Sequence, residues 1–174
     1  MTRPFSRRAG LFALTLLALT ALTGRAHTQL NAPKFLKATA VAPATVTPGK
    51  PFDLAVTLTI AAPYHIQANP TTEGYIPTEV KAGTVKGLTA GKPVYPKGTQ
   101  VTISGDKLSV YEGAVKVMLS ITPDKALKPG KITLPVTIHY QGCDDKACFP
   151  PTDTQVSVVL TIGKPTASKK MASR

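Results

Sequence analysis

The sequence predicts an all-β sandwich. Apolar and polar residues alternate with a period of two in four segments, a pattern typical of strands that turn one face to a core and the other to water. Turn-forming Pro and Gly residues separate these segments, and residues 27–174 contain no helical period of useful length. The chain has no Trp, and its two cysteines, Cys143 and Cys148, are close in sequence. An inter-sheet Cys…Trp…Cys core of the antibody type is therefore excluded.

Each alternating segment is expected to form one strand of the sandwich. The first covers residues 52–60, and the other three follow one another in the second half of the chain. Between the first and second segments the pattern is weaker, so we expect a short strand or bend at 64–67, a possible strand over 78–85, and strand seeds at 94–95 and 101–103. The core-facing residues of the four segments are Phe52, Leu54, Val56, Leu58 and Ile60; Val115, Val117, Leu119 and Ile121; Ile132, Leu134, Val136, Ile138 and Tyr140; and Val156, Val158, Leu160 and Ile162.

Residues 1–26 have the organisation of a secretory signal peptide. A basic start precedes an apolar run over 10–22, and Gly24 and Ala26 place small residues where a signal peptidase reads them. The apolar run is too short to span a membrane, although a retained N-terminal anchor is the alternative. We expect cleavage after Ala26 and a periplasmic or secreted protein, exported by the Sec route or, with a poorer motif match, by the twin-arginine route.

The predicted mature chain consists of one domain over 27–162 and a polar basic tail over 163–174, with no transmembrane segment. Removing residues 1–26 of the 174 leaves 148 residues, enough to bury a core without help from disulfides. It also lowers the formal net charge from +12 to +8, because the segment contains four Arg and no acidic residue. The remaining basic residues are scattered and not interleaved with aromatic residues, so nucleic acid is not an expected partner.

Both cysteines lie in the segment 140–151, between the last two alternating strands, and we expect this segment to form the tip of a β-hairpin. The C-x4-C spacing differs from the C-x-x-C of thioredoxin-type helices, and no second Cys or His pair stands nearby to complete a zinc site. Opposed residues on paired strands are close enough to be bridged, and an exported protein can keep a disulfide.

Two arguments favour a disulfide that opens and closes over a structural one. The core residues of the 132–140 strand are even-numbered, so Cys143 is expected to point away from the core, together with His139 and Gln141. A disulfide across so short a loop constrains the unfolded chain by only about 2 kcal/mol.

The charges beside the cysteines predict that neither cysteine is a strongly activated nucleophile, so that exchange begins when the thiolate of a partner attacks the disulfide. Asp144 and Asp145 disfavour a thiolate, whereas Lys146 favours one. We expect Cys148 to be attacked first, because it lies away from the two aspartates and next to Phe149.

The stretch Tyr140-Gln141-Gly142-Cys143…Cys148-Phe149-Pro150-Pro151 resembles the active-site hairpin of the N-terminal periplasmic domain of the DsbD family of thiol:disulfide interchange proteins. Segments 64–66, 76–80 and 110–113 also resemble family segments in the same order, and the resemblance covers roughly 35–162. It implies an immunoglobulin-like sandwich with the redox cysteine hairpin at one end. It further implies that Cys143 and Cys148 are the redox pair, that Leu108, Val110 and Tyr111 form a shielding cap, and that Tyr64, Tyr140 and Phe149 lie near the active site.

The resemblance also implies partners. The electron donor would be a membrane-embedded thiol reductase or a thioredoxin-like protein, and the client a disulfide isomerase or a thioredoxin-like protein of cytochrome c maturation, with no cofactor. The hairpin has one residue fewer between its cysteines than the best-known family member. The transmembrane and thioredoxin-like domains that normally follow are absent from this sequence, so we expect the electrons to come from a separate protein.

Other interpretations of the cysteines and histidines remain. The main alternative is a secreted immunoglobulin-like binding module with a purely structural disulfide. A zinc site formed by Cys143, Cys148 and His139 lacks a fourth ligand. Copper binding by His65, His139 and Met118 is weaker still, because lone histidines on strands are usually surface or packing residues. We therefore expect no metal.

Overall fold

The computed structural model describes residues 34–164, which form eleven β-strands and no helix. The predicted signal peptide over 1–26 lies outside the described residues, as does the predicted tail beyond residue 164, and both stay predictions. Within residues 34–164, no helix of sufficient length and apolar character to cross a membrane occurs. The all-β prediction is confirmed.

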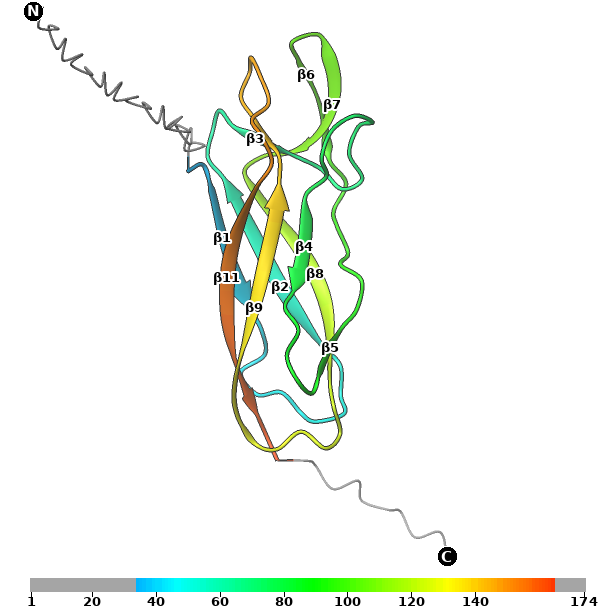
Figure 1. Cartoon of the computed structure of the whole chain (residues 1–174), viewed down its shortest axis with the longest axis vertical. Coiled ribbons are helices and arrows are strands. Elements are labelled where there is room, and N and C mark those ends of the chain that lie inside the picture. Colours follow the sequence, from blue (N-terminus) through cyan, green and yellow to red (C-terminus); the bar gives the residue numbers. More distant parts are fainter. Residues whose placement is uncertain (1–33, 165–174) are drawn as a thin grey trace, which may run out of the picture. The chain divides into compact units, whose positions relative to one another are not determined.

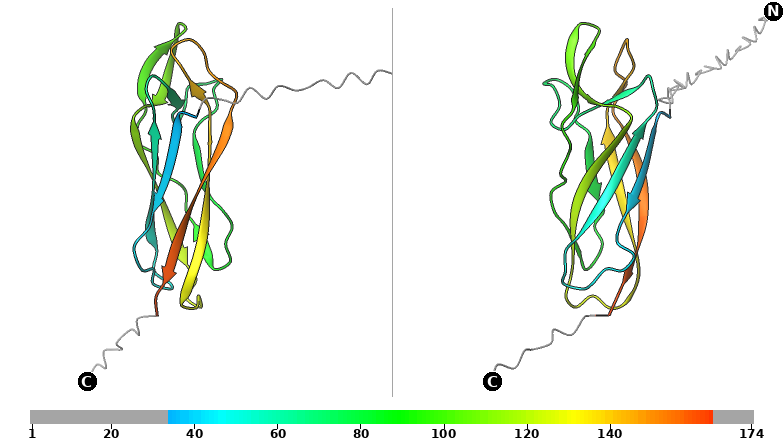
Figure 2. Two further views of the ribbon diagram at one scale, coloured as in Figure 1. Left: turned by 90° about the vertical axis from the view of Figure 1, so that its left-hand side faces the viewer. Right: turned by 180° about the vertical axis from the view of Figure 1, so that it is seen from behind.

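Two antiparallel sheets form the sandwich (Figures 1 and 2). The first contains, in spatial order, β1 (Leu36–Val41), β2 (Phe52–Ile60), β8 (Ala114–Pro123) and β5 (Leu88–Ala90). The second contains β11 (Thr152–Ile162), β9 (Gly130–Tyr140) and β4 (Glu79–Ala82). This arrangement is the immunoglobulin-like sandwich expected from the sequence.

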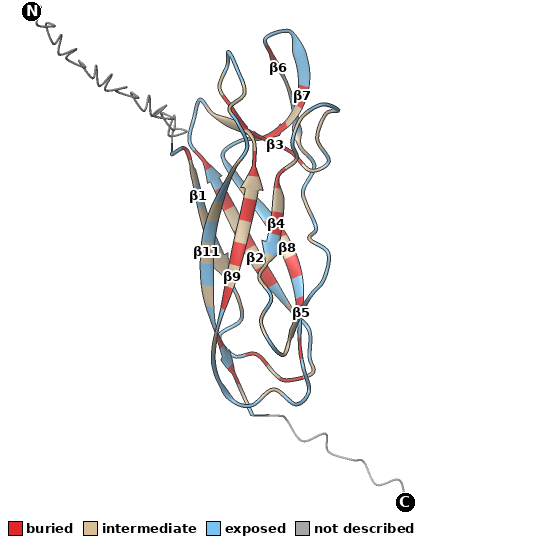
Figure 3. Cartoon of the chain, viewed as in Figure 1, coloured by how far each residue is buried: buried red, intermediate tan, exposed pale blue. Residues whose placement is uncertain are grey.

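The main core lies between these sheets and is formed largely by the predicted alternating residues (Figure 3). In β2 and β9, residues such as Leu54, Leu58, Leu134 and Ile138 are fully buried or nearly so, whereas their neighbours in sequence are more exposed. The predicted core residues of β11 are buried only at its C-terminal end, where Ile162 forms a parallel bridge with Val46; along the rest of its length β11 is an edge strand that pairs with β9. Burying one face of each strand also determines the register, since a shift by one residue would expose every core side chain.

A third, smaller sheet lies at one end of the sandwich, where Figure 1 shows the β6–β7 hairpin beside the cysteine hairpin. Its strands, in spatial order, are β10 (Gly142–Cys143), β3 (His65–Gln67), β7 (Asp106–Tyr111) and β6 (Thr99–Ile103). One face of this sheet contributes Ile66 and Tyr111 to the main core. The opposite face contributes Leu108, Val110 and Cys143 to a second apolar cluster.

The weakly patterned middle of the chain is the part that differs most from the expectation. The possible strand over 78–85 is limited to β4, and the seed at 94–95 provides only an isolated bridge between Val94 and Met118. The seed at 101–103 lies in β6, and the apolar patch after it lies in β7. These two strands pair with each other through a tight turn at Ser104 and Gly105, both with positive φ. The hairpin they form is the structural link between this middle segment and the cysteines.

Candidate active site

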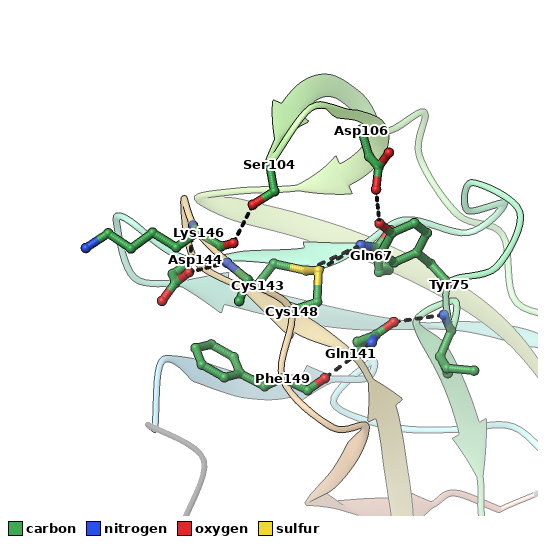
Figure 4. The surroundings of a disulfide bond; sticks show 12 residues. Gln67, Tyr75, Ser104, Asp106, Gln141, Cys143, Asp144, Lys146, Cys148 and Phe149 are labelled. Atoms are coloured by element: carbon green, nitrogen blue, oxygen red, sulfur yellow. Dashed lines mark hydrogen bonds between the residues drawn. A yellow bond between two sulfur atoms is a disulfide. The ribbon is translucent and has the colours of Figure 1, made fainter.

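The two cysteines form a disulfide across the tip of a hairpin, as expected (Figure 4). Cys143 ends β10, and Cys148 faces it as an isolated antiparallel bridge with the Cα atoms 3.9 Å apart. Main-chain bonds close the hairpin on both sides of the disulfide: Phe149 N donates to Gly142 O at 2.7 Å, and Asp144 N donates to Ala147 O at 3.0 Å. The sulfurs are therefore held by a backbone that is hydrogen-bonded independently of the S–S bond.

The two sulfurs have different surroundings. Cys143 is completely buried, whereas Cys148 is only partly buried. The parity argument places Cys143 outside the main core, and it does lie outside that core, but it is not at the surface. It packs in the second cluster, which we call the sulfur cluster and which consists of Ile103, Leu108, Val110 and Cys143 with Tyr75, Val101 and Cys148 around them.

Gln67 contacts both sulfurs and was not singled out from the sequence. Its side chain is fully buried, and its Nε2 donates to Cys143 Sγ at 3.4 Å and to Cys148 Sγ at 3.8 Å (Figure 4). The other end of the amide is fixed, because Thr71 Oγ1 donates to Gln67 Oε1 at 2.8 Å. In the sequence, Gln67 is visible only as a polar residue between Ile66 and Ala68. This pattern is also found in strands whose polar residues face the solvent, so it does not predict a buried amide.

The backbone of Gln67 is equally constrained. Its N–H donates to Gln141 O at 2.9 Å, and its carbonyl accepts from the Thr78 hydroxyl at 2.6 Å and from the Thr78 N–H at 3.3 Å. Thr78 is itself fully buried. Buried polar groups of this kind are almost always hydrogen-bonded, and here the bonds hold the Gln67 side chain in one direction.

The β6–β7 hairpin covers the sulfur cluster, and two side-chain hydrogen bonds attach its tip (Figure 4). The Ser104 hydroxyl donates to the carbonyl of Lys146, in the cysteine hairpin. The Tyr75 hydroxyl donates to Asp106 Oδ2 at 2.9 Å, which raises the pKa of Tyr75 above its usual value. The hairpin is thus tied to the segments on both sides of it.

The three residues expected to form the cap are divided between the two faces of β7. Leu108 and Val110 are fully buried in the sulfur cluster, beside Cys143. Tyr111 belongs to the main core, and its hydroxyl lies 3.1 Å from Asn69 O and 2.9 Å from Pro96 O. Alternation along a strand explains the division, because Tyr111 is odd-numbered and the other two residues are even-numbered.

The three aromatic residues expected near the active site pack around Phe35. The Phe35 ring stacks on Tyr64 at a centroid distance of 4.6 Å, meets Tyr140 edge-on at 5.9 Å, and lies 6.1 Å from Phe149. Phe149 directly follows Cys148 in the chain, so this group holds the returning arm of the cysteine hairpin against the main core. Burial raises the pKa of Tyr140.

Gly142 allows Phe35 to occupy this position. A Cβ atom placed on Gly142 would lie 2.0 Å from Phe35 Cζ and 2.8 Å from Phe35 Cε2, closer than carbon atoms approach one another. The Gly142 of the cysteine motif is thus required by the close approach of a ring to its backbone.

Asp144 organises the hairpin tip. Its Oδ1 accepts hydrogen bonds from the N–H groups of Lys146 and Ala147, both at 2.8 Å. These bonds hold the pKa of the Asp144 carboxyl below its usual value. The carboxylate that the sequence suggested as an obstacle to a thiolate is therefore already engaged by the backbone of the tip.

The two histidines in the proposed metal sites face separate carboxylates. His139 Nδ1 lies 2.7 Å from Asp153 Oδ1, and His65 Nε2 lies 3.4 Å from Glu112 Oε2. Among residues 34–164, no three His, Cys, Asp or Glu side chains gather in a way that could hold a metal ion. The geometry offers a disulfide with one completely buried and one partly buried cysteine, and this arrangement is suited to exchange with a thiol that approaches Cys148.

The fold and the site together define an immunoglobulin-like domain with a cysteine pair at one end. The family model described as thiol:disulfide interchange protein DsbD, N-terminal, matches residues 32–160. The chain belongs to this family and is a thiol–disulfide interchange domain.

Several solved structures are similar. The reduced DsbD N-terminal domain from Neisseria meningitidis shares 22% identity, with 73% of this chain and 86% of that chain covered and a TM-score of 0.47. The N-terminal periplasmic domain of ScsB from Proteus mirabilis shares 12% identity, with 78% and 50% covered and a TM-score of 0.51, and this likeness shows the fold. The complex of the DsbD and PilB N-terminal domains from Neisseria meningitidis matches at 18% identity, with 74% and 87% covered and a TM-score of 0.45. No curated protein matches the sequence.

Replacing Gly142 by Ala should destabilise the domain by about 1–3 kcal/mol, because the added methyl group displaces the Phe35 ring. Chemical denaturation of Gly142→Ala measures the loss. The same substitution in a Phe35→Leu background should cost less, since a smaller side chain leaves room for the methyl group. Equal costs in the two backgrounds would contradict the contact as the cause.

Acid should loosen the hairpin tip through Asp144. Because the folded pKa of Asp144 is lowered, its bonds stabilise the tip above the usual aspartate pKa of about 3.9 and are lost as the pH falls through the lower folded value. The amide NMR signals of Lys146 and Ala147 should therefore shift with a midpoint below that usual value. Asp144→Asn, which keeps the acceptor without the charge, should abolish this titration. A midpoint at or above the usual value would contradict the assignment.

Proposed function

We propose that the domain exchanges disulfides with protein partners through Cys143 and Cys148. The observation that carries the proposal is the asymmetric pair itself, in which Cys143 is completely buried beside the β6–β7 hairpin and Cys148 is only partly buried. The two cysteines have a sequence separation of 5. A purely structural disulfide across so short a loop would stabilise the fold by only about 2 kcal/mol, through the chain entropy of the unfolded state. The main core shares no residue with the sulfur cluster, so the packing of the main core does not require the S–S bond.

The exchange proceeds in two displacements. A partner thiolate attacks the Sγ of Cys148 in line with the S–S bond, a new bond forms to the partner, and Cys143 leaves with the electron pair as a thiolate. A second partner thiolate then attacks the partner's own sulfur, and Cys148 is released, leaving the reduced pair. The reduced pair transfers two electrons to the disulfide of a client by the same steps in reverse.

Access favours Cys148 as the sulfur that partners attack. An attacking thiolate must approach from outside, and Cys143 has no exposed surface. Cys148 is followed by Phe149, whose ring is partly buried against the aromatic group. A partner that reaches Cys148 would therefore contact the returning arm of the hairpin first.

The β6–β7 hairpin acts as the cap of the pair. Leu108 and Val110 pack against Cys143, and Ile103 packs in the same cluster near the turn of the hairpin. Tyr111 anchors strand β7 in the main core. The two tip bonds, from Ser104 to Lys146 and from Tyr75 to Asp106, are the contacts that must open when a partner approaches. Both bonds are solvent-exposed, as expected for a segment that opens locally.

The proposed partners follow from family membership and from the expected export. A membrane-embedded thiol reductase or a thioredoxin-like protein would supply electrons, and a disulfide isomerase or a thioredoxin-like cytochrome c maturation protein would receive them. The site of this work would be the periplasm, reached through the signal peptide predicted over 1–26. The alternative is a binding module in which the same disulfide is purely structural.

Single-cysteine variants should separate the two roles. Cys143→Ala retains the partly buried Cys148, which should displace the small thiol from a single-cysteine thioredoxin-like protein that is activated as a mixed disulfide with that small thiol. The adduct between the two proteins should be stable, because neither protein has a second cysteine that could release its partner. Cys148→Ala retains only the buried sulfur and should trap little or none. Non-reducing electrophoresis with mass spectrometry measures the adduct. The reverse pattern would contradict Cys148 as the entry point.

The reduction potential decides between exchange and a structural disulfide. Equilibration with glutathione should place the pair between about −270 and −180 mV, whereas a structural disulfide lies below about −300 mV. Circular dichroism should show the same fold in both redox states. Failure of both single-cysteine variants to trap a partner, together with a potential in the structural range, would establish the binding module instead.

Opening the cap should expose the reduced pair to small oxidants. Ile103→Ala removes cover near the hairpin turn without altering the cysteine hairpin, and oxidation of the reduced pair by a small disulfide should become several-fold faster. Stopped-flow measurement gives the rate. Val159→Ala, which changes an exposed residue of β11, serves as the control and should leave the rate unchanged. If the reduced pair of Ile103→Ala is oxidised at the wild-type rate, the β6–β7 hairpin does not shield the cysteines.

A further inference from the structure

We propose that Gln67 is a positioning residue of the exchange reaction, whose side-chain amide stabilises the thiolate that Cys143 becomes when the disulfide opens. Through this contact Gln67 directs partners to Cys148. The inference rests on the proposed function, because it assigns a residue that favours one direction of attack on the same pair.

The amide has one orientation that satisfies its neighbours. Thr71 Oγ1 lies 2.8 Å from Oε1, and Nε2 faces both sulfurs. A disulfide sulfur has no proton to donate, so the reverse orientation would place the amide oxygen against sulfur lone pairs without any hydrogen bond. The donor end of Gln67 therefore points at the disulfide.

In the oxidised state this donor is poorly satisfied. Gln67 is fully buried, and the sulfurs at 3.4 and 3.8 Å are the hydrogen-bond partners of its Nε2 within residues 34–164. Neutral sulfur is a weak acceptor, and burying an amide without good partners is unfavourable. A thiolate is a charged acceptor, and hydrogen bonds to charged groups are roughly twice as strong as neutral ones. The amide therefore interacts more strongly with the opened state than with the closed one.

The contact is directional, since Nε2 lies 0.4 Å closer to Cys143 than to Cys148. When a partner attacks Cys148, the S–S electron pair moves onto Cys143, beside the nearer N–H donor. When a partner attacks Cys143, the leaving thiolate is Cys148, farther from the donor. The attack on Cys148 is therefore favoured by leaving-group stabilisation as well as by access.

Among residues 34–164, the titratable groups around Cys143 make no hydrogen bond to its sulfur. Burial in the sulfur cluster disfavours a charged sulfur. The titratable groups that face Cys143 are His65, opposite it on β3 and paired with Glu112; Tyr75 in the cluster, whose hydroxyl donates to Asp106; and Asp144, whose carboxylate binds the hairpin backbone. Among these contacts, the Gln67 amide is the one that donates a hydrogen bond to the Cys143 sulfur.

The test compares the titration of Cys143 with and without the amide. In a Cys148→Ala background, the pH dependence of the ultraviolet absorbance of the thiolate gives the pKa of the Cys143 thiol in the whole domain, without requiring a reagent to reach the buried sulfur. Gln67→Met keeps the length of the side chain and removes the donor, and it should raise this pKa by about one unit, equivalent to the loss of a charge-assisted hydrogen bond. In the two-cysteine protein, the rate of reduction by dithiothreitol should fall by less than the tenfold equivalent of one pKa unit, because only part of the charge has developed on the Cys143 sulfur in the transition state.

Two further variants sharpen the test. Thr71→Val leaves Gln67 in place and frees the amide to rotate. It should therefore raise the pKa of Cys143 and lower the rate of reduction by dithiothreitol, each by less than Gln67→Met does. Gln155→Met removes an exposed amide that bonds Thr137 on the far sheet and should change neither. A purely structural role for Gln67 would lower stability without moving the pH profile.

The outcomes separate this inference from the proposed function. An unchanged Cys143 pKa in folded Gln67→Met overturns the role of Gln67 while leaving the exchange function intact. If Gln67→Met does not fold, Thr71→Val provides the decision, and an unchanged pH profile there overturns the inference. If the wild-type potential lies in the structural range, the proposed function fails, whereas the single-cysteine titration still reports on the amide.

Discussion

The place of the disulfide depends on the contact between the Phe35 ring and the backbone of Gly142. Up to Tyr140, β9 belongs to the main sandwich, but two residues later the chain pairs with β3 in the terminal sheet. The ring of Phe35 fills the end of the core at this change of sheet, and it can do so only because Gly142 has no side chain. Tyr64 and Phe149 pack on the same ring. One aromatic group thus closes the core and fixes both arms of the cysteine hairpin.

The separation of two apolar clusters allows a reversible bond in a stable protein. The main core lies between the two large sheets and takes no atom from the cysteines, while the sulfur cluster is small and lies on the other face of the terminal sheet. Breaking the S–S bond changes packing in the small cluster without requiring the sandwich to repack. Strand β7 joins the two clusters, because Tyr111 packs in one and Val110 in the other. The β6–β7 hairpin is therefore anchored in the main core at its base, whereas exposed side-chain hydrogen bonds hold its tip.

Period-two alternation was sufficient to predict the sandwich, since β2, β8 and β9 each bury one face along a long strand and β11 does so at its C-terminal end. The cysteine hairpin could be predicted from its position between two such strands. The terminal sheet could not, because β3 and β10 have three and two residues and are defined by long-range pairing. The family resemblance grouped Leu108, Val110 and Tyr111 as one cap, yet alternation along β7 turns Tyr111 to the other face. Gln67 required the tertiary structure, because nothing in a single sequence distinguishes a buried amide from an exposed one.

The choice of an amide beside the sulfurs has a physical reason. A lysine or arginine in the place of Gln67 would stabilise a thiolate more strongly, but in the oxidised state it would bury a full charge against a neutral disulfide and apolar side chains, at a cost of several kcal/mol. A leucine would suit the oxidised state and leave the thiolate of Cys143 without a donor. The amide has no net charge, so the oxidised state tolerates it, and its fixed dipole favours negative charge on the nearer sulfur. A buried exchange site therefore gains most from a neutral donor, held in one direction by groups such as Thr71 that do not touch the sulfurs.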